Sequence, residues 1–339
     1  MDKDNKNLDQ LWQELLAKGA NNEILCEIIN DVPQLREKAW LELKKIGPSN
    51  EDLRHLVEHI ADLRNEAWQI LKKRSLTNYE LKNIIEYVEP LRLEAWRIFK
   101  KQDPTNFELR DIIRYVDSLQ MEAWKILFKQ KVKEKDLLYL IKFVPAIRLE
   151  AWDALLESEA DTEDFYYIMK NVPELRSAAW EEFKLVSLNK EEIIKIIEDI
   201  ETLRFVAWQE ILLRGVTDSD LCRIMKNVKE LRNEAWQELQ RYGLNNDNLI
   251  FIMKNIKEFV DEAWKIFLTR NPSNDDLCYV IKDVPAKRDE AWARLKKQNP
   301  TNDELKFIIK YVDDLEYEAE RLINKTTDDL LNKIKAATQ

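Results

Sequence analysis

The stretch LRLEAWRIF at residues 91–99 contains a motif, L-R-x-E-A-W-x-x-L, that recurs along the whole chain. Its tryptophan is the most regular position. All eleven tryptophans follow one another at intervals of 28 residues, at positions 12, 40, 68, 96, 124, 152, 180, 208, 236, 264 and 292. Glu320 occupies the next position of the series. A fixed period of this length is typical of proteins built from stacked structural repeats.

Each period contains two segments with helical spacing. The first, helix A, extends from about six residues before the tryptophan to six after it, with apolar residues five before, one before and three after. The second, helix B, carries an apolar quartet at i, i+3, i+4 and i+7, as in Leu53, Leu56, Val57 and Ile60. This spacing places the apolar side chains on one face of a helix.

Short polar segments separate the two helices. Nine residues after the tryptophan position stands a residue that can cap helix B in every repeat except that of Lys133: Asn21, Ser49, Thr77, Thr105, Asp161, Asn189, Thr217, Asn245, Ser273, Thr301 and Asp329. An acid three residues later often completes a capping box, as Glu80 does for Thr77. All four glycines lie seven residues after a tryptophan, where helix A needs a left-handed residue to end.

Composition agrees with an all-α protein. Four Gly and nine Pro among 339 residues, with 45% hydrophobic and 35% charged residues, exclude both a β-sandwich and a disordered chain. We therefore predict a right-handed α-solenoid of about twelve two-helix repeats. We expect a single domain over 1–339, with an N-terminal cap at 1–20, regular repeats at 21–319 and a C-terminal cap at 320–339 that includes the polar segment 330–335.

The LRLEAWRIF helix resembles the V-R-x-x-A-x-x-x-L helix of HEAT-like repeats and of leucine-rich variant repeats. The likeness covers all repeats but concerns architecture alone, because the strict period of 28 and the tryptophan depart from both families. Those families mostly serve as protein-binding scaffolds, with some DNA-binding members. The resemblance implies a binding role, and it implies that helix A lines the concave side of the solenoid.

The sequence carries no signature of catalysis or of a cofactor. It has no phosphate-binding loop, nucleophile elbow, His-Glu-x-x-His or Cys-x-x-Cys motif, so we predict a protein that is not an enzyme and needs no cofactor. No apolar run of membrane-spanning length and no secretory signal is present. Cys26, Cys222 and Cys278 share one register and lie at least two repeats apart, too far for a disulfide. We expect reduced thiols and a cytoplasmic location.

The two histidines, His55 and His59, lie one turn apart on helix B. Stacking would bring Glu27 and Asp31 of the preceding repeat beside them, and two imidazoles with two carboxylates are able to hold a divalent metal. A solvated pair of surface histidines is the simpler interpretation. We therefore predict no metal site.

The tryptophans have two interpretations. Exposed aromatic rings would stack on a ligand, whereas the fixed alanine neighbour and the apolar flanks favour a buried spacer between repeats. We predict the spacer. An arginine stands four residues before the tryptophan in eight repeats, where it would lie on the indole or bind carbonyls at the end of a helix B: 36, 64, 92, 148, 176, 204, 232 and 288.

Two variable positions of helix B lie opposite its apolar quartet, thirteen and ten residues before the tryptophan position. The first is aromatic in five repeats: Tyr139, Tyr167, Phe251, Tyr279 and Phe307. The second is basic in seven, as Arg114 and six lysines: Lys142, Lys170, Lys226, Lys254, Lys282 and Lys310. Exposed aromatics beside a basic row, in a chain of net charge −10, predict a face that binds an acidic protein or extended peptide.

Several alternatives remain open. The lysines lie in the last turn of helix B, where a cation stabilises the helix dipole, so their role is structural in one interpretation. On helix A, Leu93, Met121, Leu149 and Phe205 point outward and would suit a basic amphipathic segment. The resemblance favours helix A as the concave side and the aromatic positions favour helix B, so both assignments stay open. Nucleic acid is an alternative ligand for the basic and aromatic row, although the acidic pI of about 5.1 counts against it. The third alternative is a structural or self-assembling rod.

Overall fold

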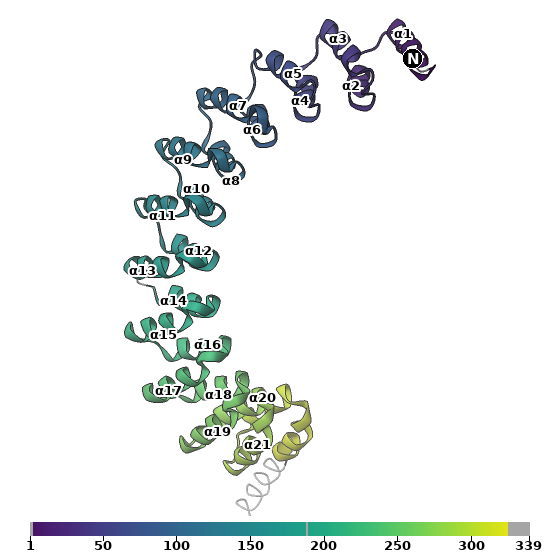
Figure 1. Cartoon of the computed structure of the whole chain (residues 1–339). Helices are drawn as coiled ribbons and strands as arrows, with labels where there is room; N and C mark the ends of the chain where they lie inside the picture. The colour runs from purple at the N-terminus through teal and green to yellow at the C-terminus, as the bar shows by residue number, and fades with distance from the viewer. Residues whose placement is uncertain (1–2, 188, 325–339) are drawn as a thin grey trace, which may run out of the picture. The chain divides into compact units, whose positions relative to one another are not determined.

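The computed structural model describes residues 3–187 and 189–324, and this part of the chain is all-α, without a strand (Figure 1). The predicted fold class is confirmed, because consecutive helices pack in pairs along the chain. The chain divides into two compact units, Met1–Leu175 and Arg176–Gln339. None of the described helices has the length and apolar character needed to cross a membrane.

Odd-numbered helices are helices A and even-numbered helices are helices B. In the first unit, helices A are α1 (Lys3–Ala17), α3 (Arg36–Ile46), α5 (Arg64–Leu71), α7 (Arg92–Phe99), α9 (Gln120–Lys129) and α11 (Arg148–Leu156). Helices B are α2 (Asn22–Asp31), α4 (Asn50–His59), α6 (Asn78–Tyr87), α8 (Asn106–Tyr115), α10 (Glu134–Phe143) and α12 (Thr162–Asn171).

The second unit continues the same alternation. Its helices A are α13 (Arg176–Val186), α15 (Arg204–Leu213), α17 (Arg232–Tyr242), α19 (Val260–Thr269) and α21 (Arg288–Lys297). Its helices B are α14 (Lys190–Asp199), α16 (Asp218–Asn227), α18 (Asn246–Asn255), α20 (Asn274–Asp283) and α22 (Asn302–Tyr311).

The predicted caps of helix B are confirmed. In every repeat with a capping side chain at that position among the described residues, the side chain accepts a backbone N–H of the first turn. Lys133 makes no such bond. The capping box of Thr77 and Glu80 is present, with both of its hydrogen bonds. Asp329 and the segment 330–335 of the predicted C-terminal cap lie outside the described residues.

The predicted start of helix A is about two residues too early for the α-helix itself. The α-helix begins at the arginine four residues before the tryptophan, and a three-residue 3-10 turn such as Glu89–Leu91 precedes it in most repeats. The cause is the extended residue that ends helix B. Val88 has φ −115° and ψ 78°, and its carbonyl accepts the Leu91 N–H at 3.0 Å, which closes a tight turn. The segment is helical in spacing, as predicted, but not continuously α-helical.

Helix A ends through a left-handed residue, as the glycine positions predict. Gly47 has φ +95° and accepts no Cβ without strain. In four repeats without glycine, the same position holds Asp103, Lys131, Asn271 or Asn299, each also with positive φ, whereas Ser75, Glu159 and Ser187 at this position do not adopt it. Two of these four are asparagines, which tolerate this conformation better than most residues.

The tryptophans are buried spacers, as predicted, since each ring has at most 6% of its surface exposed. The sequence did not reveal a second role. The Trp68 indole Nε1 donates to the Glu94 carboxylate of the next repeat at 2.7 Å. The same bond joins tryptophans 40, 96, 264 and 292 to glutamates 66, 122, 290 and 318. The glutamate of the motif therefore links each of these helices A to the preceding repeat.

The arginines of the motif adopt the second of their two predicted roles. Arg92 Nε donates to the Ile85 carbonyl oxygen at 2.8 Å, near the end of the preceding helix B. Among the contacts described, the equivalent bond is made by arginines 36, 64, 148, 204, 232 and 288. Five of the seven also pair with an acid 26 residues later, as Arg204 does with Glu230 at 3.0 Å. Each of these five arginines thus binds a carbonyl oxygen near the end of helix B and forms an ion pair with the next repeat.

Titration of Glu94 tests the link between tryptophan and glutamate. Hydrogen bonds from Lys72 and from Trp68 lower the pKa of the Glu94 carboxyl. A lowered pKa in the folded state stabilises the protein above the pKa of the unfolded chain, and this contribution is lost as pH falls through the folded pKa. We expect Trp68→Phe to raise the Glu94 pKa towards its ordinary value. Carbon-13 NMR of the carboxyl groups measures this, with Glu66, which bonds to Trp40, as the internal control that stays unchanged.

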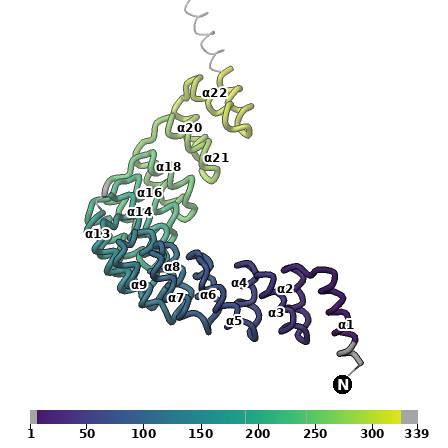
Figure 2. The backbone as a smooth tube through the Cα atoms, turned by 90° about the horizontal axis from the view of Figure 1, so that it is seen from above, coloured from purple at the N-terminus to yellow at the C-terminus, as the bar shows by residue number. Residues whose placement is uncertain are grey.

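Within each unit the two kinds of helix form two layers. Helices B of successive repeats pack directly on one another, from α6 to α12 in the first unit and from α14 to α22 in the second. Helices A of successive repeats are joined instead through long Trp, Glu and Arg side chains. The first unit bends accordingly, with helices B on the inner side of its curve (Figures 1 and 2). In this unit helix B, rather than helix A as the resemblance implied, lines the concave side.

Candidate partner-binding face on helices B

The structure places all eleven predicted binding residues on helices B. In the first unit, α10 carries Tyr139 and Lys142, and α12 carries Tyr167 and Lys170. The second unit has the longer row, on four successive helices B: Lys226 on α16, Phe251 and Lys254 on α18, Tyr279 and Lys282 on α20, and Phe307 and Lys310 on α22. The face predicted by the helical spacing is therefore formed separately within each unit.

The aromatic side chains are less exposed than we expected. Of the five predicted rings, only Tyr279, with 49% of its surface accessible, is an exposed residue. Tyr139, Tyr167, Phe251 and Phe307 are half-buried. The expectation of five solvent-exposed rings is corrected, because each half-buried ring packs beside a cation of the preceding repeat.

Those packing partners follow a rule across repeats. The residue ten before one tryptophan meets the residue thirteen before the next. The Lys142, Lys226 and Lys282 ammonium groups lie 5.3, 5.9 and 5.7 Å from the ring centroids of Tyr167, Phe251 and Phe307. In the first repeats the two equivalent positions form a polar contact, in which His55 Nε2 lies 3.0 Å from the Asn30 amide oxygen. These contacts join successive helices B, so the basic and aromatic residues have a partly structural role.

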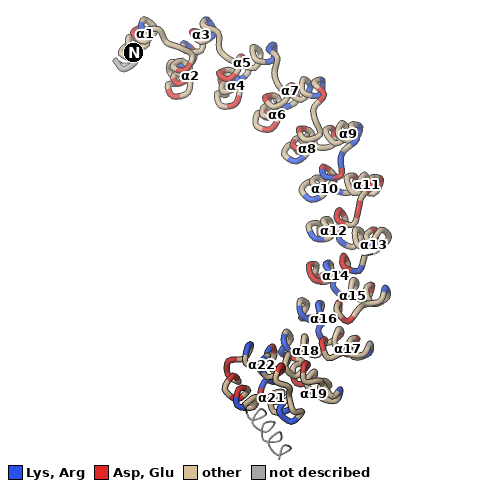
Figure 3. The backbone as a smooth tube through the Cα atoms, turned by 180° about the vertical axis from the view of Figure 1, so that it is seen from behind, with Lys and Arg blue, Asp and Glu red and all other residues tan. Residues whose placement is uncertain are grey.

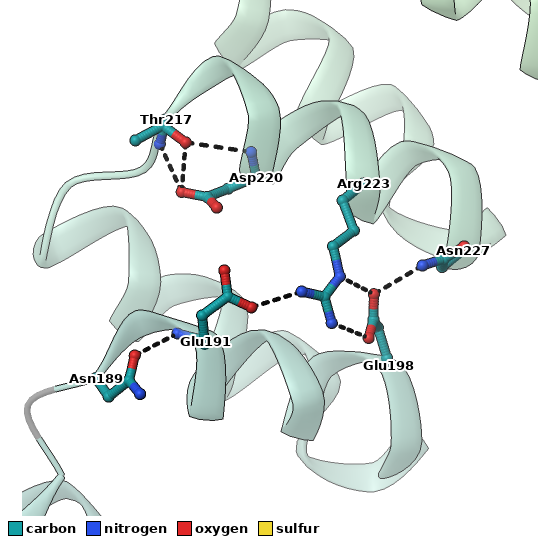
Figure 4. Close-up of polar contacts among 7 residues, drawn as sticks. All are labelled: Asn189, Glu191, Glu198, Thr217, Asp220, Arg223 and Asn227. Carbon is teal, nitrogen blue, oxygen red and sulfur yellow. Dashed lines mark hydrogen bonds and ion pairs between the residues drawn. The ribbon is translucent and has the colours of Figure 1, made fainter.

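Glu198 and Arg223 form the ionic version of this pair (Figure 4). Arg223 on α16 donates from Nε and Nη2 to the two Glu198 oxygens, both at 2.8 Å, and from Nη1 to Glu191. These bonds raise the pKa of Arg223 and lower that of Glu198, against the opposing effect of burial on the carboxyl. Asn227 donates to Glu198 as well. Arg223 is fully engaged and offers little charge to a partner.

Several lysines of the row keep their charge available. Lys254 pairs with Asp283 at 3.1 Å, and Lys142 donates to Asn171. Among the residues that the structure describes, Lys226, Lys282 and Lys310 have no carboxylate within ion-pair distance. Lys310 hydrogen bonds to Tyr311 and lowers its pKa. The second unit therefore presents three ammonium groups without a carboxylate partner, on α16, α20 and α22. Lys and Arg positions along the backbone are blue in Figure 3.

Grooves between neighbouring helices B coincide with the three cysteines. The groove between α16 and α18, of about 470 Å³, is lined by Cys222, Lys226 and Phe251. A groove of about 330 Å³ between α20 and α22 contains Cys278, Tyr279 and Phe307. A third groove, between α2 and α4, contains Cys26. The other repeats carry larger side chains at this register, namely Arg, Lys, Leu, Tyr or Ile. The small thiol leaves the space open.

The thiols themselves are not disposed to react. All three cysteines are free, in agreement with the prediction that they form no disulfide. Burial, followed by nearby carboxylates, raises the pKa of Cys26, Cys222 and Cys278 to about 12. The grooves are therefore candidate sites for packing a side chain and not for thiol chemistry.

A further exposed aromatic row was missed in the sequence. Tyr87, Tyr115 and Phe143 end three successive helices B, with 76%, 58% and 41% of their surfaces exposed. They stand nine residues before a tryptophan, next to the positions that we selected. The signal was an aromatic residue in the same register of three consecutive repeats.

The rival surface on helix A is present too. Leu93, Met121, Leu149 and Phe205 are exposed, as the spacing predicted. The glutamates beside this row are in part occupied, since Glu94 and Glu122 bind the indoles and lysines of the preceding repeats. The row extends over only three successive helices in the first unit, α7, α9 and α11.

The histidine pair does not form a metal centre in the structure. His55 Nε2 lies 3.0 Å from the Asn30 amide oxygen, and His59 lies 3.7 Å from Glu58. In the described ranges no group of three or more His, Cys, Asp or Glu residues is arranged to hold a metal ion. Glu27 and Asp31 are exposed and are not brought together with both imidazoles.

Comparison with protein-family models, with curated proteins and with solved structures gives no match for this chain. The assignment of the fold therefore rests on the chain's own repeats.

Proposed function

We propose that the chain is a non-enzymatic scaffold that binds an acidic, extended protein segment along the helices B of the second unit. The observation that carries the proposal is the row of three ammonium groups without a carboxylate partner, Lys226, Lys282 and Lys310, on a chain whose net charge is −10. A local excess of positive charge on an acidic protein favours an acidic partner and disfavours contacts elsewhere.

The grooves support the proposal by adding sites for apolar side chains. An extended segment that crosses α16 to α22 would place carboxylates near the lysines. It would place an apolar side chain against Phe251 in the groove of Cys222, or against Phe307 in the groove of Cys278. Aromatic residues in such positions commonly contribute most of the binding energy at an interface. The charged row then sets the register of the segment.

A matched pair of variants tests the proposal. The probe is a pool of fluorescein-labelled 15-residue peptides rich in Asp, Glu, Leu and Phe, measured by anisotropy against the full chain. Lys226→Gln with Lys282→Gln is expected to weaken binding by about 5–30-fold, because each exposed ion pair contributes at most about 1 kcal/mol. The affinity of the original chain should fall as salt is added.

The control carries Lys265→Gln and Lys297→Gln, two exposed lysines on helices A of the same unit. It has the same net charge as the test variant and is expected to bind like the original chain. Equal weakening in both variants would show non-specific attraction and contradict the proposal. Tighter binding of single-stranded DNA than of any acidic peptide would favour nucleic acid as the ligand instead.

A further inference from the structure

The first unit carries an aromatic row that the acidic-segment proposal does not use. Tyr87, Tyr115 and Phe143 are the last residues of α6, α8 and α10, so each successive repeat presents one exposed ring at the same place. These helices pack directly on one another in the inner layer of the unit (Figure 2). Large exposed rings in a regular row are typical of an interaction surface.

Two cations beside the row, Arg114 and Lys142, have no carboxylate partner among the described residues, whereas the neighbouring cations of α6 and α8 are paired. Lys82 pairs with Asp111 at 2.7 Å, and Arg110 pairs with Asp136 at 3.0 Å. Arg114, in contrast, has no carboxylate partner among the residues described. It is held instead by aromatic side chains, and it donates a hydrogen bond to the Tyr139 hydroxyl.

The position of Arg114 is fixed by rings on both repeats. Its guanidinium carbon lies 5.0 Å from the ring centroid of Tyr115, on its own helix, and 4.3 Å from that of Phe143, on the next. Arg114 therefore lies between two members of the row, with no described carboxylate within ion-pair distance. A planar guanidinium held in this way is a preorganised donor for a ligand oxygen.

The spacing of the row selects a ligand conformation. Packed helices lie about 8–10 Å apart, which sets the distance between successive rings. A polyproline II helix has three residues per turn and rises about 3.1 Å per residue, so the same side returns about every 9.3 Å. A β-strand returns its side chains to one face about every 6.8 Å and would fall out of register with the rings.

The chemistry of polyproline II also suits these side chains. Proline rings are compact and apolar, and proline-rich segments dock in grooves lined by aromatic side chains. The carbonyl groups of a polyproline II segment make no internal hydrogen bonds and remain available as acceptors. Arg114 would supply donors to such carbonyls between the second and third rings.

We propose that Tyr87, Tyr115 and Phe143 bind a proline-rich segment in the polyproline II conformation, with one proline stacked on each ring and Arg114 bonded to a carbonyl of the segment. The inference rests on the proposed function only in taking the layer of helices B as the binding face. It concerns the first unit and a different ligand chemistry.

The test begins with the original full-length chain and two labelled peptides of identical composition. One has proline at every third residue, and the other has the same prolines at every fourth residue. We expect the three-residue spacing to bind at least about tenfold more tightly in a fluorescence anisotropy titration, since each stacked ring contributes about 0.5–1.5 kcal/mol. Equal affinities, or no binding of either peptide, overturn the proposal without requiring any variant.

Variants then locate the site. Tyr87→Ala and Phe143→Ala are each expected to weaken binding of the peptide with proline at every third residue by about 3–10-fold. The matched control is Tyr79→Ala, an exposed tyrosine in the first turn of α6, outside the row, which should have no effect. Equal losses in the control and in the row variants contradict the proposed site.

The same titrations separate this inference from the proposed function. The Lys226→Gln/Lys282→Gln variant should bind the proline peptide as the original chain does. If that variant loses the proline peptide, the aromatic row of the first unit is not its site. If acidic peptides fail to bind while the peptide with proline at every third residue binds, the acidic-segment proposal is contradicted and the polyproline II proposal is supported.

Discussion

Replacement of Trp96 by alanine is expected to lower the free energy of unfolding by about 3–5 kcal/mol. Trp96 is 1% exposed and stacks on Phe99, with ring centroids 5.7 Å apart. Its indole also donates to Glu122 of the next repeat. The variant therefore opens a cavity and removes an inter-repeat hydrogen bond together. In a stacked array each repeat contacts only its neighbours, so the loss is concentrated at the interfaces of that repeat. Urea unfolding followed by circular dichroism measures the effect.

Leu93→Ala on the same helix is the control for this prediction. Leu93 is 59% exposed, and its removal is expected to change the free energy of unfolding by less than about 0.5 kcal/mol. Trp96→Phe keeps part of the ring packing but not the bond to Glu122, so its cost should lie between those of the two alanine variants. Similar costs for Trp96→Ala and Leu93→Ala would show that the tryptophan is not a spacer between repeats.

The parts of the fold that depend on nearby residues could be predicted. A capping side chain such as Thr77 bonds to a backbone N–H three residues away, and Gly47 adopts its left-handed conformation within one loop. Contacts between repeats were harder to foresee. The Trp68–Glu94 bond joins residues 26 positions apart, which no helical spacing reveals. The recurring glutamate of the motif was the available signal. Its tryptophan partner could be identified only from the distance between successive helices A.

The candidate binding face was also predicted only in part. Helical spacing places Phe251 and Lys226 on the correct face of their helices, because that depends on one helix alone. It does not show that Lys226 lies over the Phe251 ring of the next repeat and reduces its exposure. The reverse error concerned Tyr115, the last residue of α8, which the apolar quartet did not mark as a candidate but which is exposed. Exposure depends on the neighbouring helix, and the sequence does not give its position.

Alkylation of Cys222 at pH 8 is expected to be at least about 50-fold slower in the folded chain than in the unfolded chain. Burial, followed by the charge of Asp218, raises the pKa of Cys222 from 9.0 to about 12. At pH 8 this lowers the thiolate fraction about 1000-fold, and the greater nucleophilicity of a more basic thiolate recovers about 20-fold. Cys26 and Cys278 are expected to behave alike, since the pKa of each is raised to about 12 as well. Mass spectrometry after timed iodoacetamide treatment gives the rate for each cysteine.

The control is Ser219→Cys, one turn before Cys222 on α16, at an exposed position that lines the same groove. A thiol there shares the helix and the groove but not the burial, so it should react at close to the unfolded rate. A folded-state rate for Cys222 equal to that of the Ser219→Cys thiol would show that the Cys222 thiol is not desolvated. Slow reaction at Cys222 together with fast reaction at position 219 would instead locate the barrier in the packing of α16 against α18. The groove would then be accessible at position 219, while the Cys222 sulfur remains buried at its base.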